Sequence, residues 1–535
     1  MNPLEQHADT ITGTAILNCL GREASAVEGR VTVGDTHVTI GLPRTGTVLR
    51  ARRGRWMSDP ERRVGDRWRP LDWRELVTLV CRELTLHTGA APEGFVAEIA
   101  QSRAALGAML RARAEAPLPE EPYRRSEQAL VAGHRYHPAP KGRGGAAAEQ
   151  WLPYTPEAHT CFPLRLLAVR ADAVAEEGTV TGLDGAAAAV PDGYRPLVAH
   201  PWQLDLLEER LRGLFEGGVL RWVEARHRPV WPTSSVRTVY DPAADAFLKF
   251  SLDVRITNDI RRMWRYDLRW TSPLAGLLGE VFAEVGAVFP GAAFLADRGY
   301  RTVDVGDTDV YEGLAVLLRD GVRAHARPGV TPLLAAGISE GFPGNPLDGL
   351  GADAALGWWR RYLAVVVPPA LHAFFRHGVV LECHMQNVLV GVDGDGMPVQ
   401  AFFRDQEGVR LLASRHAALL REIDGPHARE RGVETASGWR RLQYCLVVNH
   451  LNEIAGAVVE RHPALAADVW AEARAAFLAY GHDHGTAREL HDLLTSPCVP
   501  GKTNMLLRWT RSHGSAATYI DHPNPLRLPA AVTGR

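Results

Sequence analysis

The 535-residue sequence lacks the features of a secreted, membrane-spanning or cysteine-clustered protein. Its six cysteines lie far apart and form no CxxC pair, which argues against a zinc site and a disulfide framework. The first residues, MNPLEQHADT, do not have the basic and then apolar order of a signal peptide. The longest apolar stretch, residues 362–375, is shorter than the ~20 residues that a membrane span needs. We therefore expect a cytoplasmic protein.

An excess of charge of one sign is also missing. Lys and Arg number 60 and Asp and Glu number 62, so the formal net charge is −2. Such a balance gives no broad field that would hold nucleic acid or an anionic membrane. The hydrophobic share of 46% and the charged share of 23% are typical of globular proteins and exclude extended disorder. Any anion must therefore be bound in a local site.

Lysine is scarce. Only three of the 60 basic residues are lysines, namely Lys141, Lys249 and Lys502. A genome that favours arginine codons is the simpler explanation. However, the lysine ammonium is a compact charge and the arginine guanidinium is a wide planar fork, so a narrow site can require the former. The neighbours of the three lysines are therefore of interest.

The pattern of apolar residues predicts an α+β chain of about three domains. Residues 1–130 mix short strand-like pieces (30–42) with amphipathic helices such as 73–88. Residues 136–150 are rich in Pro and Gly and predict a loop. Strands and turns dominate residues 160–260, interrupted by a helix expected at residues 201–216, and the last 180 residues are mainly helical.

A β-hairpin is the clearest element of the helical part. The β-rich runs 388–390 and 399–403 are joined by the turn sequence DGDG at 393–396. Pairing of these runs would bring Asn387 and Asp405 to one edge of the sheet, where an amide and a carboxylate suit Mg²⁺. The alternative is that Asn and Asp flank the strands only as turn formers. Protein and aminoglycoside kinases have a similar Asn and Asp order, but the catalytic aspartate that they need before the Asn is missing here.

A second pair of strands is expected at residues 232–238 and 247–252. The hydroxyls of Ser234 and Ser235, with Arg237 and Lys249, would form a cradle for phosphate groups. The alternative is that Lys249 lies on a solvated face of its strand.

Residues 254–262 predict a strand that runs into a helix spanning residues 259–282. Thr257 or Asn258 would cap this helix, whose N-terminus favours anions. Arg261, one turn further, could bind a carboxylate or a phosphate. The alternative is a simple helix cap with a solvated basic turn.

Two other motifs carry less weight. Residues 501–503 end like a P-loop but lack its earlier glycine. Residues 482–484, His-Asp-His, could suggest a metal cluster, and we interpret them as a solvated loop.

The chain resembles the IucA/IucC family of NRPS-independent siderophore (NIS) synthetases in seven short sequence motifs, which occur in the same order as in the family. They are GHRYHPAPKGRGG (133–145), HPWQ (200–203), PTSSVRTV (232–239), LKFSLDVRITNDIRR (248–262), HGVVLECHMQNVLV (377–390), FRDQEG (403–408) and KTNMLLR (502–508). All three lysines lie within them. The resemblance implies a cupped hand, with a thumb at 1–150, fingers at 151–350, and a palm at 351–535 that holds a kinase-like nucleotide site.

The resemblance also implies an activity. Family enzymes use ATP to convert a carboxylate to an acyl-adenylate, and an amine or alcohol then displaces AMP. The sequence of residues 254–262 resembles that of the family branch that uses citrate. We therefore expect an ATP-dependent citrate ligase that releases AMP and pyrophosphate. The second substrate would be a diamine or an amino-acid derivative, and the chain would form a homodimer. The alternatives are a kinase-like phosphotransferase or acyl-phosphate ligase, and a noncatalytic protein that binds a nucleotide or a siderophore.

The residues that match the family's site are assigned by the same resemblance. The ATP phosphates would contact Ser235, Arg237, Lys249, Arg261 and His384, together with Ser234 from the predicted cradle. Magnesium would bind Asn387 and Asp405, with Gln386 and Glu407. The carboxylate substrate would contact His137, Lys141, Thr257, Asn258, Arg261, His384 and Arg508. Lys249 and Arg261 would support catalysis, and His384 would accept the proton of the amine.

Overall fold

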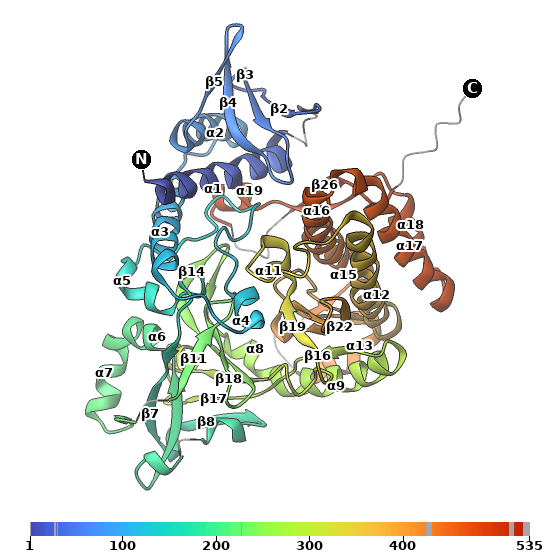
Figure 1. Ribbon diagram of the computed structural model, residues 1–535. Helices are drawn as coiled ribbons and strands as arrows, with labels where there is room; N and C mark the ends of the chain where they lie inside the picture. Colours follow the sequence, from blue (N-terminus) through green and yellow to red (C-terminus); the bar gives the residue numbers. More distant parts are fainter. Residues whose placement is uncertain are drawn as a thin grey trace.

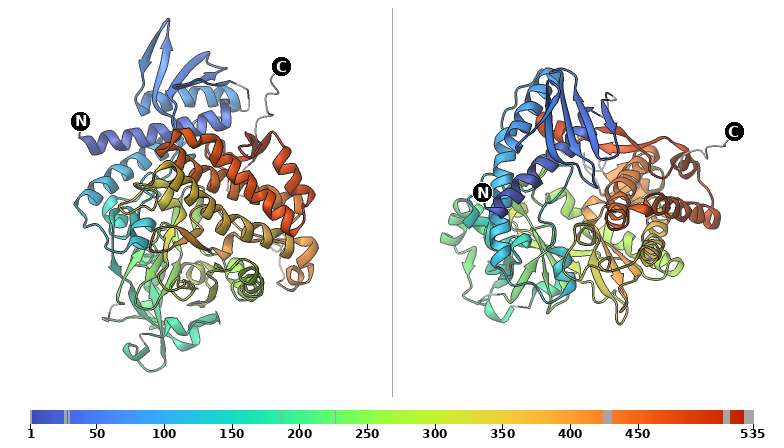
Figure 2. Two further views of the ribbon diagram at one scale, coloured as in Figure 1. Left: turned by 45° about the vertical axis from the view of Figure 1, so that its right-hand side comes forward. Right: turned by 45° about the horizontal axis from the view of Figure 1, so that its top comes forward.

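The computed structural model describes residues 2–25, 28, 30–185, 187–225, 227–423, 431–512 and 518–527. Figure 1 shows a mixed helix and strand fold in which the N-terminal residues lie at one end and the C-terminal helices pack beside the middle of the chain. The two further views in Figure 2 show the same arrangement of an N-terminal, a middle and a C-terminal region. None of the described helices is both long and apolar enough to cross a membrane.

The N-terminal region combines helices with an antiparallel sheet of five strands in sequence order. Its strands are β1 (Val31–Val33), β2 (His37–Leu42), β3 (Thr47–Arg52), β4 (Ser58–Val64) and β5 (Arg67–Pro70). Its helices are α1 (Pro3–Leu20), α2 (Trp73–Thr88), α3 (Phe95–Glu115) and α4 (Pro122–Glu127). α2 begins at a capping box of Asp72 and Glu75 and ends at Gly89, whose φ of 71° fits the left-handed conformation that glycine adopts without strain. The strands predicted at 30–42 and the helix predicted at 73–88 are confirmed.

The middle region contains a seven-stranded sheet in the order β6-β11-β12-β13-β18-β17-β8. These strands are β6 (Phe162–Pro163), β8 (Val174–Gly178), β11 (Pro229–Pro232), β12 (Thr238–Asp241), β13 (Ala246–Phe250), β17 (Asp297–Val303) and β18 (Val316–Asp320). Smaller sheets are formed by β7 (Arg165–Arg170), β9 (Tyr194–Ala199) and β10 (Leu220–Trp222), and by β14 (Leu252–Ile256) and β15 (Asp259–Arg261). The helices are α5 (Ala148–Trp151), α6 (Pro201–Leu206), α7 (Glu208–Glu216), α8 (Arg265–Arg269), α9 (Thr271–Val288) and α10 (Thr308–Gly313).

The C-terminal region has a four-stranded sheet in the order β16-β22-β21-β19. Its strands are β16 (Ala292–Phe294), β19 (Thr331–Leu334), β21 (Val388–Val392) and β22 (Pro398–Phe403). The helices are α11 (Ala335–Glu340), α12 (Ala352–His377), α13 (Ala413–Glu422), α15 (Thr435–Gln443), α16 (Asn452–Arg461), α17 (Ala466–His484), α18 (Arg488–Thr495) and α19 (Met505–Trp509), with a π-helix at Tyr444–Leu451. The short strands are β20 (Val379–Val380), β23 (Arg410–Leu412), β24 (Gly432–Val433), β25 (Cys498–Lys502) and β26 (Tyr519–Pro523).

Buried side chains form separate cores in the three regions. The largest core joins the C-terminal helices with α9 and β16, which come from earlier in the chain. Conversely, Met505 and Trp509 of α19 pack into the N-terminal core beside α1 and α2. The domain boundaries at 150 and 350 therefore stay predictions, since segments on both sides of them share cores.

Three predicted elements are wrong in detail. Residues 259–262 do not begin a helix, because β14 and β15 pair as a hairpin with Ile256 opposite Asp259. Thr257 and Asn258 form its turn and cap no helix. Residues 233–237 form a turn that leads into β12, with Val236 at a φ of 66°. Residues 201–216 form two helices that break at Leu207.

Candidate active site

The hairpin of β21 and β22 places two predicted magnesium ligands at the same end of the sheet. Val388 pairs with Phe403, and the next backbone pair continues this register because Arg404 N–H donates to the Asn387 carbonyl over 3.0 Å. Asn387 and Asp405 therefore both lie where the hairpin ends, as the sequence predicts. Asp405 itself has a φ of 77°, an uncommon conformation for a residue with a side chain.

Lys249 joins this hairpin end to the seven-stranded sheet. β12 and β13 pair antiparallel with Thr238 opposite Lys249, which places the lysine next to the turn that carries Arg237. Its ammonium donates to Asp405 Oδ1 over 3.1 Å and to Glu407 Oε2 over 2.7 Å. The lysine is only 3% exposed, so it does not lie on a solvated strand face.

Two arginines complete a ring of cations around the two carboxylates. Arg237 Nη2 donates to Glu407 Oε2 over 2.9 Å, and Arg319 Nη2 lies 3.4 Å from Asp405 Oδ1. Burial alone would raise the pKa of Glu407, but the charges of Lys249 and Arg237 lower it to about 2. The pKa of Asp405 is also lowered, by Lys249 and then Arg319, against the effect of burial. Both carboxylates are ionised at neutral pH.

The oxygen atoms at the hairpin end fit a hard divalent cation. Lys249 and Arg319 both contact Oδ1 of Asp405, so Oδ2 is the oxygen left for an ion. Asn387 Nδ2 donates to the Glu382 carbonyl over 3.1 Å, which leaves Oδ1 of the carboxamide for the same purpose. Carboxylate and amide oxygens completed by water and phosphate are the ligands that Mg²⁺ prefers.

Gln386 and Ser234 connect the hairpin to the turn that precedes β12. Gln386 Nε2 donates to the Ser234 carbonyl over 3.0 Å, and Ser234 N–H donates to Glu127 Oε2 over 3.1 Å. The Ser234 hydroxyl is buried without a partner among the described residues. Ser235 lies beside it, with its hydroxyl 3.4 Å from that of Thr238. The predicted cradle residues are therefore brought together by a turn, not by a strand.

Arg261 lies next to this ring and is held in place by the β14–β15 turn. Its guanidinium donates to the Ile256 carbonyl over 3.0 Å and to the Thr257 hydroxyl over 2.8 Å. Burial lowers its pKa, and the nearby charge of Arg237 lowers it further. Two neighbouring guanidinium groups that repel each other are well placed to share an anion.

His137 and Asn258 form the other wall of the site. Ala139 N–H donates to His137 Nδ1, so Nε2 carries the proton and donates to Asn258 Oδ1, 3.1 Å away. Asn258 in turn donates to Asn504 over 3.2 Å. Burial lowers the pKa of His137 to about 4, and the nearby charges of Arg508 and Arg261 also lower it, against its hydrogen bond to Asn258. The imidazole is therefore neutral.

His384 lies three residues before Asn387, at the start of the hairpin, and its carbonyl accepts from Asn387 N–H over 2.9 Å. Its Nε2 accepts a long hydrogen bond of 3.3 Å from Asn387. Burial lowers its pKa, and the charges of Glu382 and Asp405 act in the opposite direction. A neutral imidazole beside Asp405 is a suitable proton acceptor.

Two predicted substrate ligands have other partners. Lys141 forms a buried ion pair with Glu157 and also donates to the Leu130 carbonyl. This ion pair occupies the ammonium of Lys141, and its predicted contact with substrate stays a prediction. Arg508 forms an ion pair with Glu98, and its Nε donates over 3.1 Å. Arg508 nevertheless lies close enough to His137 to lower the pKa of that residue.

Sequence reasoning missed Arg22 and His134. Arg22 is 5% exposed, its Cζ lies 3.3 Å from the centre of the Tyr136 ring, and its guanidinium nitrogens have no hydrogen-bond partner among the described residues. Burial lowers the pKa of His134 to about 3, and the charges of His137, Arg22 and His384 add to this effect. These groups therefore lie together. The only sequence signal for His134 was its place in the phrase at 133–145, and Arg22 had none.

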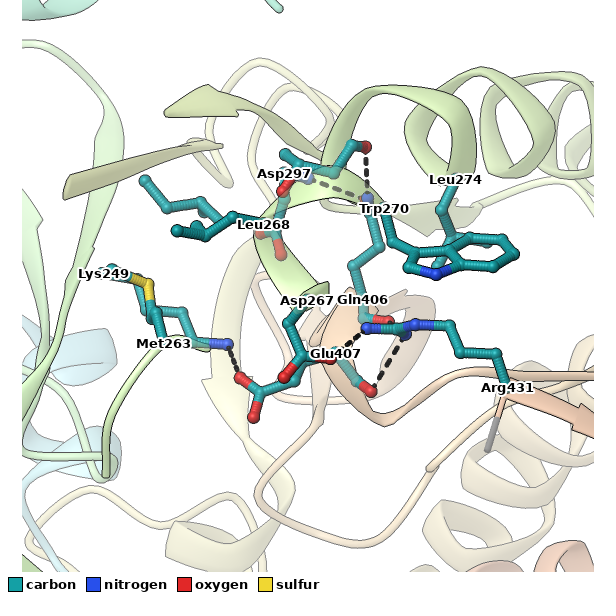
Figure 3. Close-up of a pocket in the computed structure, with 12 residues that line it drawn as sticks. Lys249, Met263, Asp267, Leu268, Trp270, Leu274, Asp297, Gln406, Glu407 and Arg431 are labelled. Carbon is teal, nitrogen blue, oxygen red and sulfur yellow. Dashed lines mark hydrogen bonds and ion pairs between the residues drawn. The ribbon is translucent and has the colours of Figure 1, made fainter. Parts of the chain in front are cut away.

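A small pocket opens beside Lys249 and Glu407 (Figure 3). One side is apolar and includes Met263, Leu268 and Trp270. Burial and the nearby charge of Glu407 raise the pKa of Asp267, another lining residue, to about 6. The pocket thus joins an apolar surface to the cation ring.

Two parts of the chain match known protein families. Residues 122–340 match the family described as "IucA / IucC family", and residues 357–516 match the family described as "Ferric iron reductase FhuF-like transporter". The first match contains the cation ring from Arg237 to Arg319, and the second contains the β21–β22 hairpin. The words "ferric iron reductase" and "transporter" describe members of the second family and are not a finding about this chain.

Several curated proteins are similar in sequence. The rhizobactin siderophore biosynthesis protein RhbC of Rhizobium meliloti is 30% identical over 62% of each chain. The alignment therefore spans less than two thirds of that relative. L-2,3-diaminopropanoate–citrate ligase of Staphylococcus aureus is 29% identical over 76% of this chain and 75% of the relative. Spermidine-citrate ligase of Bacillus anthracis is 26% identical over 76% of this chain and 74% of the relative.

Solved structures share the fold. ATP-bound aerobactin synthetase IucA of Klebsiella pneumoniae superimposes with a TM-score of 0.84 at 22% identity, over 97% of this chain and 100% of that one. Aerobactin synthetase IucC of the same organism gives a TM-score of 0.74 at 20% identity, over 97% and 98% of the two chains. The mixed helix and strand fold is therefore that of the siderophore synthetases. By sequence, residues 122–340 therefore belong to the IucA/IucC family, and the whole chain shares the fold of the aerobactin synthetases.

Proposed function

We propose that the protein is an ATP-dependent ligase of siderophore biosynthesis that joins citrate to an amine or alcohol and releases AMP and pyrophosphate. The contact of Lys249 with both Asp405 and Glu407 carries this proposal, because it unites the cation ring and the predicted metal ligands in one site. Relatives that are named citrate ligases support citrate and an amine as the substrates.

The first step brings two anions together. A carboxylate oxygen of citrate attacks the α-phosphorus of ATP, the bond to the β-phosphate oxygen breaks, and pyrophosphate leaves. Arg237, Lys249 and Arg261 neutralise the phosphate charge that opposes this attack. Ser234 and Ser235 are placed to donate to phosphate oxygens. Asn387 and Asp405 would hold Mg²⁺, with Gln386 and Glu407 beside them, and the ion supplies further charge neutralisation when bound.

Citrate would also contact a second wall of the site, which is formed by His137, Thr257 and Asn258. The proton on Nε2 of His137 fixes the direction of the Asn258 carboxamide, whose Nδ2 donates to Asn504 and would donate its second proton to a substrate oxygen. Arg508 adds positive charge nearby. These groups would orient one carboxylate of citrate while another reacts.

The second step needs a proton acceptor. The amine nitrogen attacks the acyl carbon of citryl-adenylate, the bond to the phosphate oxygen of AMP breaks, and the amine loses a proton. His384 is neutral and lies beside Asp405, so it would accept that proton. The chain's own residues therefore supply binding, orientation and proton transfer.

The three regions of the chain would form a cupped hand, and two copies of the chain would associate. The N-terminal region to residue 150 would act as a thumb, residues 151–350 as fingers, and residues 351–535 as a palm with the kinase-like nucleotide site. The protein would work as a homodimer. Size measurement in solution by light scattering tests the second statement, and a monomer at assay concentration would contradict it.

The function is tested with purified protein, ATP, Mg²⁺ and a panel of carboxylates in the presence of hydroxylamine. Citrate is expected to give a hydroxamate together with AMP and pyrophosphate in equal amounts. Formation of ADP and phosphate would instead indicate an acyl-phosphate ligase or phosphotransferase. Nucleotide binding without turnover on any carboxylate would indicate a binding protein.

A further inference from the structure

A group of side chains of the types that bind metal ions lies outside the site described above, where α9 of the middle region meets α12 and α17 of the C-terminal region. Glu284 is on α9, and His372 and His377 are in the last turns of α12. α17, which ends at His484, packs against α12 (Figure 1). None of these residues belongs to the ring around Lys249.

The three donor atoms are arranged as metal ligands are. One carboxylate oxygen and one ring nitrogen from each histidine lie within 4.8 Å of one another. His377 Nε2 is 3.4 Å from Glu284 Oε2, and His372 Nε2 is 3.8 Å from Glu284 Oε1. Bonds of about 2.0–2.2 Å in tetrahedral geometry hold ligand atoms roughly 3.3–3.6 Å apart. Small side-chain movements would therefore bring all three atoms onto one ion.

Burial makes these histidines unusual. His372 is only 6% exposed, yet neither of its ring nitrogens has a hydrogen-bond partner among the described residues. Nε2 of His377 is buried and also without one. A buried polar nitrogen that has lost water without gaining a partner is destabilising by about 1–3 kcal/mol. A bound cation would give a partner to one nitrogen of each histidine.

A simple ion pair between Glu284 and a protonated histidine explains the cluster less well. His372 Nε2 lies 3.8 Å from the carboxylate, beyond hydrogen-bond distance, and two histidines share this single acidic group. Arg376 donates to Glu284 over 3.4 Å, but its side chain is largely exposed and can turn away. A neutral imidazole offers the lone pair that a metal ion needs.

From this geometry we propose that Glu284, His372 and His377 bind a divalent first-row transition metal such as Zn²⁺. The fourth ligand would be His484 or a water molecule. The ring centre of His484 lies 5.3 Å from that of His372, and the side chain of His484 is exposed to solvent. Two imidazoles and one carboxylate favour Zn²⁺, Co²⁺, Ni²⁺ or Fe²⁺ over Mg²⁺, which prefers oxygen ligands. The ion would tie α9 to α12, and to α17 when His484 binds.

The test uses the full chain without a histidine tag, stripped of metal with EDTA. Zn²⁺ retained after gel filtration is measured by elemental analysis, and Co²⁺ is followed by its visible absorption. The wild-type protein is expected to hold one equivalent of Zn²⁺ in the presence of millimolar Mg²⁺. His377→Ala and Glu284→Gln should weaken binding by more than about 100-fold, the upper end of the loss for a residue that only orients a ligand. These two positions are less buried than His372, so their replacement spares the core.

His482→Ala is the matched control. His482 is two residues from His484 but is exposed and contacts Asp483, so this variant should keep the equivalent of Zn²⁺. Zn²⁺ should also raise the thermal unfolding midpoint of the wild type and of His482→Ala, but not that of His377→Ala. A wild type that retains no Zn²⁺ or Co²⁺, or a His377→Ala variant that binds as tightly as the wild type, would overturn the proposal.

Discussion

The ammonium of Lys249 lies 3.1 Å from Asp405 Oδ1, although the two residues are 156 positions apart in the chain. Lys249 comes from the seven-stranded sheet and Asp405 follows the last strand of a hairpin in the four-stranded sheet. The contact therefore joins two sheets whose strands lie far apart in sequence. A triphosphate that enters would compete with Asp405 and Glu407 for the same cations, so its binding would release both carboxylates toward Mg²⁺.

Replacing Lys249 tests whether the cation ring requires a compact charge. Lys249→Arg is expected to lower kcat/KM by about 10²–10³, the usual effect of removing one preorganised charge contact. The lysine is almost fully buried, and the wider guanidinium would not fit between Asp405 and Glu407. Arg298→Lys, at an exposed ion pair with Asp320, is the control and should leave turnover unchanged. Wild-type rates in Lys249→Arg would show that the lysine is incidental.

The partly exposed carboxylate of Asp405 can be neutralised without a change in size. Asp405→Asn is expected to keep its fold and to lose about 10²–10³ in turnover, because the site would lose a charged ligand for Mg²⁺. Rates are measured over a series of Mg²⁺ concentrations, and the fold is checked by circular dichroism. Asp395→Asn, at the exposed turn of the same hairpin, provides the comparison. A variant whose nucleotide affinity changes while turnover does not would favour a binding protein.

The local parts of the site could be predicted from the sequence. The β21–β22 hairpin follows from two β-rich runs and a DGDG turn, so the common position of Asn387 and Asp405 needed only the register. The pairing that brings Lys249 toward Arg237 likewise follows from a short turn between two apolar runs.

The parts that depend on tertiary contacts could not be predicted. Thr257 adopts a φ of 58°, which a β-branched residue rarely does, so no residue pattern predicted the β14–β15 turn. The scarcity of lysine pointed equally to Lys141, Lys249 and Lys502, and only the fold shows that Lys141 pairs with Glu157 while Lys249 pairs with Asp405 and Glu407. Arg22 approaches His134 through the packing of distant segments.

Arg22 provides a test of the part of the site that the sequence missed. Arg22→Gln is expected to raise the KM for one of the two condensing substrates by roughly 10–100-fold, since a hydrogen bond to a charged group contributes about 1.5–3 kcal/mol. Its buried guanidinium has no hydrogen-bond partner among the described residues, so it is available to an anion. Varying citrate and the amine separately identifies the substrate concerned. Arg30→Gln, at an exposed position in the same region, should leave both KM values unchanged, and an equal loss in both variants would contradict the assignment.

Acid should destabilise the protein well above the pKa of its carboxylates, because several histidines are buried in the neutral form. Burial lowers the pKa of His200 to about 3, and neither ring nitrogen has a partner among the described residues. The unfolded chain binds protons on this histidine below about pH 6.5 while the folded chain does not, so stability falls as the pH drops from about 6.5 toward 3. At pH 5 the loss from one such histidine is about 2 kcal/mol. His200 packs edge-on against Tyr154, Phe162 and Phe250, so His200→Phe should keep the packing and reduce the difference between the urea midpoints at pH 7 and pH 5. The exposed His482→Phe should not change this difference, and an unchanged difference in His200→Phe would show that other groups govern the acid sensitivity.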